Sequence, residues 1–247
     1  MKLAPPRSRP PFPPPTSHFS NATWGLSAAS RRSRGKSHLR RTGWIFFMCN
    51  AGIWTLPPAL TDDGYELLFG TNHLAHALFI KLLLPTLLRT PDARVVLMTS
   101  MAFQNARGIP LDRMRDAQRG FIESNMRYPH SKLANLIYAS ELARRYPELT
   151  AVSVHPGVVT TDMVVKAPWF ERMIIKVIQM MGETTNAPAE GAHTQLWAAT
   201  VEKGKLVAGG YYVPGGVLGA HTKQSSDEKL AGELWSWTEK ELEGYSA

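Results

Sequence analysis

Tyr128 and Lys132 stand four residues apart in the segment YPHSK, which places both side chains on one face of a predicted helix. The ordinary pKa of a phenol is about 10, which is too high for proton transfer at neutral pH. A neighbouring ammonium group lowers that pKa by stabilising the phenolate. The pair is therefore a candidate general acid or base, although a tyrosine and a lysine at this spacing also occur without any catalytic role.

The ends of the predicted strands bring further groups toward this helix. Apolar runs that are each stopped by a turn signal predict buried parallel strands over 44–49, 94–100 and 150–155. These strands end in Asn50-Ala51-Gly52, in Ser100 and in Pro156-Gly157. Ligands of open α/β sheets bind outside the carboxyl ends of the strands. We therefore expect these residues to meet Tyr128 at one site, where the Ser100 hydroxyl can orient a substrate carbonyl.

The rest of the pattern alternates helices with strands, which is typical of an α/β fold with a parallel sheet and right-handed crossovers. The first predicted helix covers 62–89, with Asp62 or Asp63 as its N-cap. The other predicted elements are helices over 128–146, 187–201 and 227–244, a strand over 210–213 and a mostly loop-like segment over 101–124.

The net charge of +8 belongs to one part of the chain. Residues 1–61 hold nine Lys or Arg and no acidic residue, whereas 62–247 hold 19 basic and 20 acidic residues. A globular surface that binds nucleic acid is therefore not expected. The best apolar run, 75–88, is interrupted by Lys81 and Pro85, so no transmembrane segment is expected.

The number and spacing of the cysteine and histidine residues do not predict a metal site. Cys49 is the single cysteine, which excludes an intrachain disulfide and a CxxC-type zinc site, and the histidines lack a spacing such as HExxH. A single cysteine favours a reducing compartment, and the sequence predicts a cytoplasmic protein.

Residues 1–43 have a different composition, with seven prolines before residue 16 followed by a Ser/Arg-rich stretch over 31–36. Proline at this density favours polyproline II and prevents helix formation, and no hydrophobic period marks a buried face. We expect this segment to be disordered. Three interpretations stay open: an inert or misassembled start, a mitochondrial transit peptide, and a proline-rich ligand for a partner.

The candidate residues resemble the short-chain dehydrogenase/reductase family over about 44–243, and the phrases HSKLAN and VHPG are most similar to its retinol-dehydrogenase-like branch and fungal relatives. The matching segments are Asn50-Ala51-Gly52, Thr71-Asn72-His73-Leu74, Ser100, 128–135 and 154–161. The resemblance implies a partial Rossmann-like, doubly wound parallel sheet that corresponds to strands four to seven of the family. It also implies an oxidoreductase that transfers a hydride between NAD(P)(H) and an alcohol or carbonyl of a fairly apolar small molecule.

The resemblance also implies a role for each matched residue. Tyr128 is the catalytic acid/base, Lys132 lowers its pKa and holds the nicotinamide ribose, Ser100 orients the carbonyl or alcohol, and Asn72 supports a proton-relay water. The implied cofactor-binding residues are Asn50, Ala51, Gly52, Tyr128, Lys132, Pro156, Gly157, Val159 and Thr161. The implied cofactor is NADP or NAD, with NADP preferred. The amphipathic stretch 162–184 would cover the substrate; its apolar face is also compatible with lying on a membrane surface.

The first part of the chain departs from the family pattern. The family opens with a strand, a TGxxxGIG turn and further βα units, which need roughly 80 residues at ~30 per unit. Here 49 residues precede Asn50, and none of them forms a GxxxGxG motif. That turn lets the backbone approach a pyrophosphate. We therefore expect a tail over 1–43 and a catalytic portion over 44–247, with a truncated, inactive member that acts as a binding partner or has no function as the alternative.

The missing first strand has a structural consequence. In the strand order of a doubly wound sheet, the predicted strand 44–49 would pair with it. We therefore expect an exposed sheet edge that favours homo-oligomers or aggregation. We also expect one face of the sheet to be uncovered around Phe46, Met48, Val96 and Met98.

Overall fold

The computed structural model describes residues 46–54, 57–159, 184–185 and 188–245. Five strands form one sheet in the order β1-β2-β3-β6-β7. They are β1 (Phe46–Cys49), β2 (Arg94–Met98), β3 (Thr150–Val154), β6 (Tyr211–Val213) and β7 (Val217–Leu218). The first four are parallel, and β7 returns antiparallel to β6. A second, two-stranded parallel sheet pairs β4 (Val158–Val159) with β5 (Thr184–Thr185).

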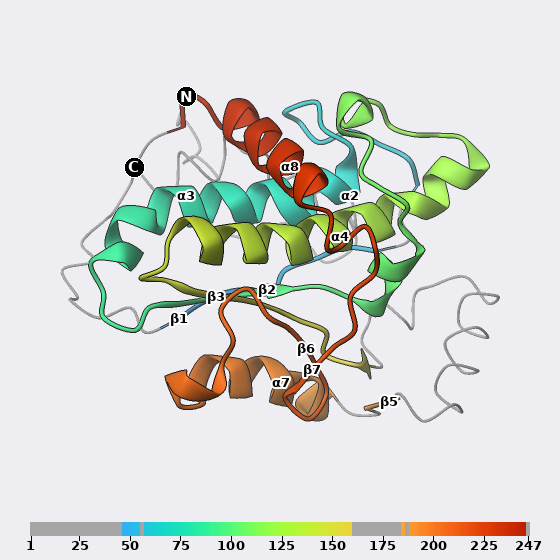
Figure 1. Cartoon of the computed structure of the whole chain (residues 1–247). Coiled ribbons are helices and arrows are strands. Elements are labelled where there is room, and N and C mark those ends of the chain that lie inside the picture. The colour runs from blue at the N-terminus through green and yellow to red at the C-terminus, as the bar shows by residue number, and fades with distance from the viewer. Residues whose placement is uncertain (1–45, 55–56, 160–183, 186–187, 246–247) are drawn as a thin grey trace, which may run out of the picture.

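Helices cover both faces of the five-stranded sheet. Figure 1 shows α3, α4 and α8 on one side of the strands and α7 on the other. The helices are α2 (Leu67–Phe69), α3 (Ala75–Leu88), α4 (Phe121–Arg145), α7 (Pro188–Thr200) and α8 (Glu228–Glu241). A π-helix, η1 (Gly70–Leu74), joins α2 to α3, and the short 3-10 helices are η2 (Met101–Asn105), η3 (Leu111–Arg113) and η4 (Lys203–Lys205). The Rossmann-like α/β fold predicted from the sequence is confirmed, with β7, β4 and β5 as unpredicted additions.

The two faces of β2 and β3 bury different core clusters, because successive strand residues point to opposite sides. Val95, Leu97 and Ala151 belong to the core on the α3 and α4 side. Val96 and Met98 pack with Ala198 of α7 on the other side. The expectation of an uncovered face is therefore wrong at Val96 and Met98, which are 0% and 5% exposed. Helix α7, from the second half of the chain, covers them.

On the α7 side of the sheet, the residues of the outer strand β1 are less buried than those of β2. Phe46 in β1 is 40% exposed, and Met48 is partly buried. Within the described part of the chain, β1 pairs with β2 alone and is an edge strand. The predicted exposed edge is therefore present along β1. Trp44 and Ile45, the first two residues of the predicted strand, lie outside the described residues.

Two helix boundaries differ from the sequence prediction. Helix α4 begins at Phe121, seven residues before Tyr128, and continues through Pro129. The first helix is capped by Glu66, whose carboxylate accepts hydrogen bonds from the amides of Leu68 and Phe69. The predicted caps Asp62 and Asp63 lie in the preceding turn. The predicted lid, 162–184, falls almost wholly outside the described residues.

The helical segment Leu67–Leu88 is long and apolar enough to cross a membrane by length and composition, with a mean hydropathy of 1.4. Of its apolar 18-residue stretch, 67% is buried inside the protein. Leu74, Leu78 and Ile80 pack in the core beside β1 and β2. The segment is thus packed as a core helix, which explains its apolar composition without a membrane.

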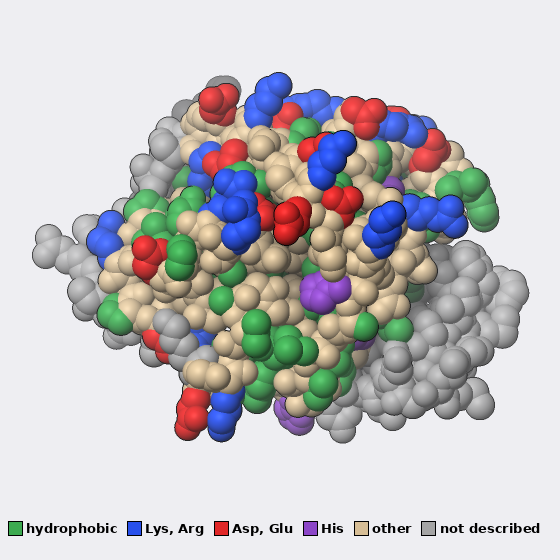
Figure 2. All heavy atoms as spheres, in the orientation of Figure 1, with side chains coloured by type: hydrophobic (Ala, Val, Ile, Leu, Met, Phe, Trp, Pro, Cys, Tyr) green, Lys and Arg blue, Asp and Glu red, His purple; other side chains and the backbone are tan. Residues whose placement is uncertain are grey.

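Charges of both signs are mixed on the face of the protein shown in Figure 2, where basic and acidic side chains lie next to one another above the sheet. Ion pairs of α8 account for part of this mixture. Lys229 lies 3.8 Å from Glu233 within the helix, and Glu239 lies 3.0 Å from Lys81 of α3. This face therefore has no extended field of a single sign, in keeping with the nearly balanced charge of residues 62–247.

Candidate active site

Ser100, Tyr128 and Lys132 meet where β2 ends and α4 passes. Ser100 follows β2 and caps η2, accepting a hydrogen bond from the amide of Ala102 at 3.3 Å. Its hydroxyl also acts on the Tyr128 phenol, whose pKa it lowers. The Nζ atom of Lys132 lies 5.4 Å from the centroid of the Tyr128 ring. The structure therefore brings Ser100, from the end of a strand, to the two side chains that the sequence placed on one helix face.

The Lys132 ammonium is buried at the end of β2. Its Nζ donates to the backbone oxygen of Met98 at 3.2 Å, and its own backbone oxygen accepts from the Thr99 hydroxyl at 2.7 Å. Burial lowers the pKa of Lys132 to about 8. No ion pair joins it to a carboxylate within the described ranges. Such an ammonium keeps N–H groups available for a ligand with hydroxyl oxygens.

The Tyr128 phenol is held mainly in its neutral form. Burial raises the pKa of Tyr128 to about 12, while the Ser100 hydroxyl acts in the opposite direction. Burial is therefore the dominant influence, in contrast to the lowering by Lys132 that the spacing suggested. Tyr128 packs beside Leu67, Leu68 and Ile53, and its ring lies 6.0 Å from that of Trp54. Its surroundings are thus largely apolar.

Asn72 lies in the π-helix η1, where the helix is locally wider than an α-helix. Its Oδ1 accepts from the amide of Ile53 at 2.8 Å, and its Nδ2 donates to the oxygen of Ile53 at 2.9 Å and to Ser131 Oγ at 3.0 Å. Both side-chain donors are thus used within the chain. Asn72 ties the loop after β1 to α4, and its predicted support of a relay water stays a prediction.

Gly70, at the start of η1, is required by close packing. A Cβ on Gly70 would lie 2.8 Å from Cγ2 of Thr61 and 3.2 Å from Cβ of Tyr65. The first distance is shorter than real Cβ atoms show. The small residue thus lets the turn before α2 pack directly against the helix that carries Asn72.

The residues predicted to hold a cofactor lie around this cluster as far as the structure describes them. Asn50 and Ala51 are exposed at the end of β1. A Cβ on Gly52 would lie 3.4 Å from both Asn72 Oδ1 and Lys132 Nζ, so this glycine borders the catalytic side chains. Pro156 and Gly157 follow β3, with Gly157 at a φ of +82°, and Val159 is in β4. Thr161 lies outside the described residues.

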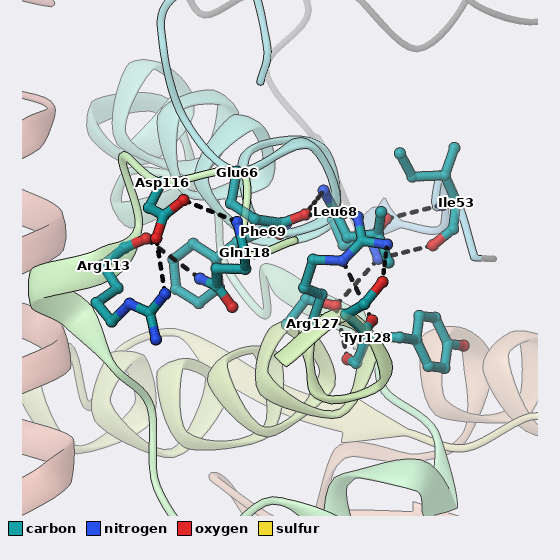
Figure 3. A network of polar contacts seen from close by, with 12 residues as sticks. Ile53, Glu66, Leu68, Phe69, Arg113, Asp116, Gln118, Arg127 and Tyr128 are labelled. Atoms are coloured by element: carbon teal, nitrogen blue, oxygen red, sulfur yellow. Dashed lines mark hydrogen bonds and ion pairs between the residues drawn. The ribbon is translucent and has the colours of Figure 1, made fainter. Parts of the chain in front are cut away.

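A buried ion pair beside the site was not predicted. Glu66 Oε1 lies 3.1 Å from Arg127 Nη1, and the two side chains are 1% and 3% exposed. Figure 3 shows Glu66 between the amides it caps and Arg127, which immediately precedes Tyr128. The pair joins the start of the helix that carries Asn72 to the helix that carries Tyr128. No local pattern marks two charges 61 residues apart, so sequence reasoning could find this pair only through the fold.

A second polar cluster in the same view belongs to the loop before α4. Arg113 pairs with Asp116 at 2.7 Å, and Asp116 accepts a hydrogen bond from the amide of Gln118 (Figure 3). Arg113 also pairs with Glu123 in the first turn of α4. These contacts fix the loop to the first turn of α4, which precedes Tyr128.

Comparison with curated proteins identifies the family. The chain is 34% identical over 204 residues to a short-chain dehydrogenase/reductase of Armillaria gallica, which covers 79% of this chain and 64% of that protein. The chain belongs to the short-chain dehydrogenase/reductase family. This member is also 33% identical over 188 residues to human retinol dehydrogenase 11, with 75% of this chain and 57% of that protein covered. It spans about three-fifths of the length of these relatives.

Among solved structures, the fold is similar to that of a 3-alpha-hydroxysteroid dehydrogenase from Pseudomonas sp. B-0831, complexed with NADH. The TM-score is 0.55 with 17% identity, and the match covers 76% of this chain and 75% of that one. No family model matches the chain. The family membership and the fold class predicted from the sequence are thus confirmed, whereas the predicted site residues stay predictions.

Proposed function

We propose that this short-chain dehydrogenase/reductase transfers a hydride between NAD(P)(H) and an alcohol or carbonyl of a fairly apolar small molecule, with Tyr128 as the acid/base. The observation that carries the proposal is the cluster at the end of β2, in which Lys132 Nζ lies 5.4 Å from the Tyr128 ring and the Ser100 hydroxyl lowers the pKa of the Tyr128 phenol. The retinol dehydrogenase among the relatives and the apolar packing around Tyr128 support an apolar substrate.

Each side chain then has a task that its position allows. In carbonyl reduction, the neutral phenol of Tyr128 gives its proton to the carbonyl oxygen as the hydride reaches the carbonyl carbon, which yields the alcohol. Ser100 orients the carbonyl oxygen toward Tyr128 by a hydrogen bond. Lys132 supplies a positive charge that favours the phenolate left behind. In alcohol oxidation the same groups act in reverse.

The residues present fit the nicotinamide end of such a cofactor. Gly52 leaves space beside Lys132 Nζ and Asn72 Oδ1 that a larger side chain would fill, and Asn50 and Ala51 are open to solvent. When bound, NAD(P)(H) would supply or accept the hydride. Lys132 would hold the ribose hydroxyls, and Gly157 would let the backbone after β3 come close. We infer NADP rather than NAD as the first cofactor to test.

One assay separates this function from that of a non-catalytic binding protein. The full chain is incubated with NADPH or NADH and a panel of long-chain and aromatic aldehydes and ketones, and the loss of reduced cofactor is followed by absorbance. Stoichiometric formation of the alcohol supports the proposal. Absence of turnover with every substrate, together with no change in cofactor fluorescence at millimolar concentration, contradicts it.

A further inference from the structure

Asn135 is a fully buried amide on the same face of α4 as Tyr128 and Lys132, and its exposed fraction is 0%. Its Nδ2 donates to the backbone oxygen of Met98 at 3.0 Å and to that of Asn72 at 2.9 Å. Its Oδ1 lies 3.1 Å from Nδ1 of His73. Every polar group of this side chain is therefore used, and each contacts a different residue.

Hydrogen-bond chemistry fixes the orientation of this amide. A backbone oxygen can only accept, so both protons of Asn135 Nδ2 point at Met98 and Asn72. The Oδ1 atom must then accept from His73, whose Nδ1 carries the proton. Nε2 of His73 in turn accepts from the Thr238 hydroxyl of α8 at 3.2 Å. Burial lowers the pKa of His73 to about 3, so the ring is neutral and this single tautomer persists at physiological pH.

The two backbone oxygens held by Asn135 are those that place the catalytic residues. The Met98 oxygen also accepts from Lys132 Nζ, and Met98 lies two residues before Ser100. The Asn72 oxygen also accepts from His76 Nδ1 at 2.8 Å. One amide thus sets the spacing between the end of β2, where Lys132 is anchored, and the π-helix that carries Asn72.

We propose that Asn135, oriented by His73 and Thr238, is a positioning residue that holds Lys132 at the distance from Tyr128 required for proton transfer. The role rests on the proposed function of Tyr128 and Lys132. Asn135 acts through the Met98 oxygen and touches neither substrate nor cofactor. Displacement of a catalytic group by about 1 Å can cost on the order of 100-fold in rate, which sets the expected scale of the effect.

The structure offers a variant that separates positioning from stability. In Asn135→Leu, the Met98 oxygen still accepts a hydrogen bond from Lys132 Nζ, and the Asn72 oxygen still accepts one from His76. Only the Nδ1 donor of His73 loses its acceptor, which was Asn135 Oδ1. The double variant Asn135→Leu/His73→Leu also removes that unsatisfied donor, and replacement of both partners by apolar groups can be nearly neutral for stability. It leaves only the Thr238 hydroxyl without its acceptor in the ring of residue 73, so most of the lost stability should return. A purely structural role predicts that activity returns with stability in the double variant, whereas a positioning role predicts that it does not.

Two readouts are measured on the full chain. The first is kcat and KM for the carbonyl substrate: we expect kcat to fall about 10- to 100-fold in both variants with little change in KM. The second is the titration of the Lys132 side chain by NMR, assigned with Lys132→Met. Within the described residues, the titratable groups that face Lys132 are Tyr128 on its own helix and His76 on α3. We expect the Lys132 midpoint to move by at least about half a pH unit in both variants.

Asn125→Leu on the exposed side of the same helix is the matched control, and it should change neither readout. An unchanged Lys132 titration in a folded Asn135→Leu protein overturns the inference, as does kcat restored in the double variant. Absence of turnover in every protein, including the unmodified chain, would instead contradict the proposed function, and the NMR titration would still decide the role of Asn135.

Discussion

Asn72 and Ile53 hydrogen-bond to each other in both directions: the Asn72 amide accepts from the Ile53 N–H at 2.8 Å and donates to the Ile53 oxygen at 2.9 Å. The loop after β1 is thereby paired with a helix residue much as a neighbouring strand would pair with it. Gly52, the residue before Ile53, consequently lies beside both Asn72 and Lys132. The end of β1 is thus joined to the candidate catalytic cluster.

Replacement of Tyr128 by Phe tests the acid/base role. It removes the only proton that the phenol can transfer, so we expect turnover to fall by about two to four orders of magnitude while cofactor binding is kept. Steady-state kinetics and a cofactor titration measure the two effects. Tyr146→Phe, near the other end of the same helix, is the control, and turnover within a few-fold of the unmodified protein in Tyr128→Phe would remove Tyr128 from this role.

A larger side chain at Gly52 tests the location of the cofactor. Alanine should fold normally, since its Cβ would make ordinary contacts at 3.4 Å with Asn72 and Lys132. Valine adds two methyl groups beside the Lys132 ammonium, and we expect the Kd for NADPH to rise at least tenfold, measured by fluorescence titration. Gly232→Val on α8, where no atom lies within 4 Å of the place that a Cβ would take, should leave it unchanged. Equal affinity in both valine variants would place the cofactor elsewhere.

The ion pair of Glu66 and Arg127 should contribute strongly to stability. Removal of one partner from a buried pair leaves an uncompensated charge and costs about 3–5 kcal/mol of unfolding free energy. Arg127→Met should therefore lower the free energy of unfolding in urea by roughly that amount. Lys229→Met at the exposed pair with Glu233 should have no measurable effect. A loss below about 1 kcal/mol in Arg127→Met would show that water reaches the pair.

Buried neutral histidines predict that the protein loses stability in mild acid. Burial lowers the pKa of His73 to about 3 and those of His76, His130 and His155 to about 4, from an ordinary value of 6.5. Their contribution is therefore complete above pH 6.5 and is lost as the pH falls toward 4, because the unfolded chain binds protons that the folded chain does not. Each histidine contributes a slope of about 1.4 kcal/mol per pH unit in that window.

Urea unfolding at about pH 7.5, 6.0 and 5.0 measures this slope. The His130→Gln variant removes one of the four groups, at a ring whose Nδ1 has no hydrogen-bond partner among the described residues. Its slope should be smaller by about 1.4 kcal/mol per pH unit. Stability that is independent of pH across this range would show that these rings take up protons in the folded protein as they do in the unfolded chain.

The edge strand β1 predicts self-association. Phe46 is 40% exposed on a strand that pairs with β2 alone in the described part of the chain, and an open apolar edge favours pairing with a second copy. We expect light scattering at micromolar protein to show dimers or larger species, and Phe46→Lys to reduce them. Val217→Lys, at the opposite end of the sheet, is the control. A monodisperse monomer of the unmodified chain would contradict the prediction.

The sequence by itself predicted the central elements and the candidate catalytic set. Apolar runs that end in Asn50 and Ser100 indicate buried parallel strands, and strand direction alone sends their ends to one edge of the sheet. The four-residue spacing of Tyr128 and Lys132 fixes them on one helix face. The predicted strands and helix face were confirmed because periodicity and strand direction are local properties of the chain, whereas the catalytic roles stay predictions.

Tertiary structure alone decided how that set is held. The pairing of Glu66 with Arg127 and the contacts of Asn135 with Met98 and His73 join residues far apart in the chain. Burial also decided the pKa of Tyr128, since desolvation outweighs the effect of a neighbouring charge that the spacing suggested. The covering of the sheet face around Val96 by helix α7 was likewise decided by tertiary structure. Packing partners, burial and electrostatics depend on which elements meet in space, and local sequence patterns do not contain that information.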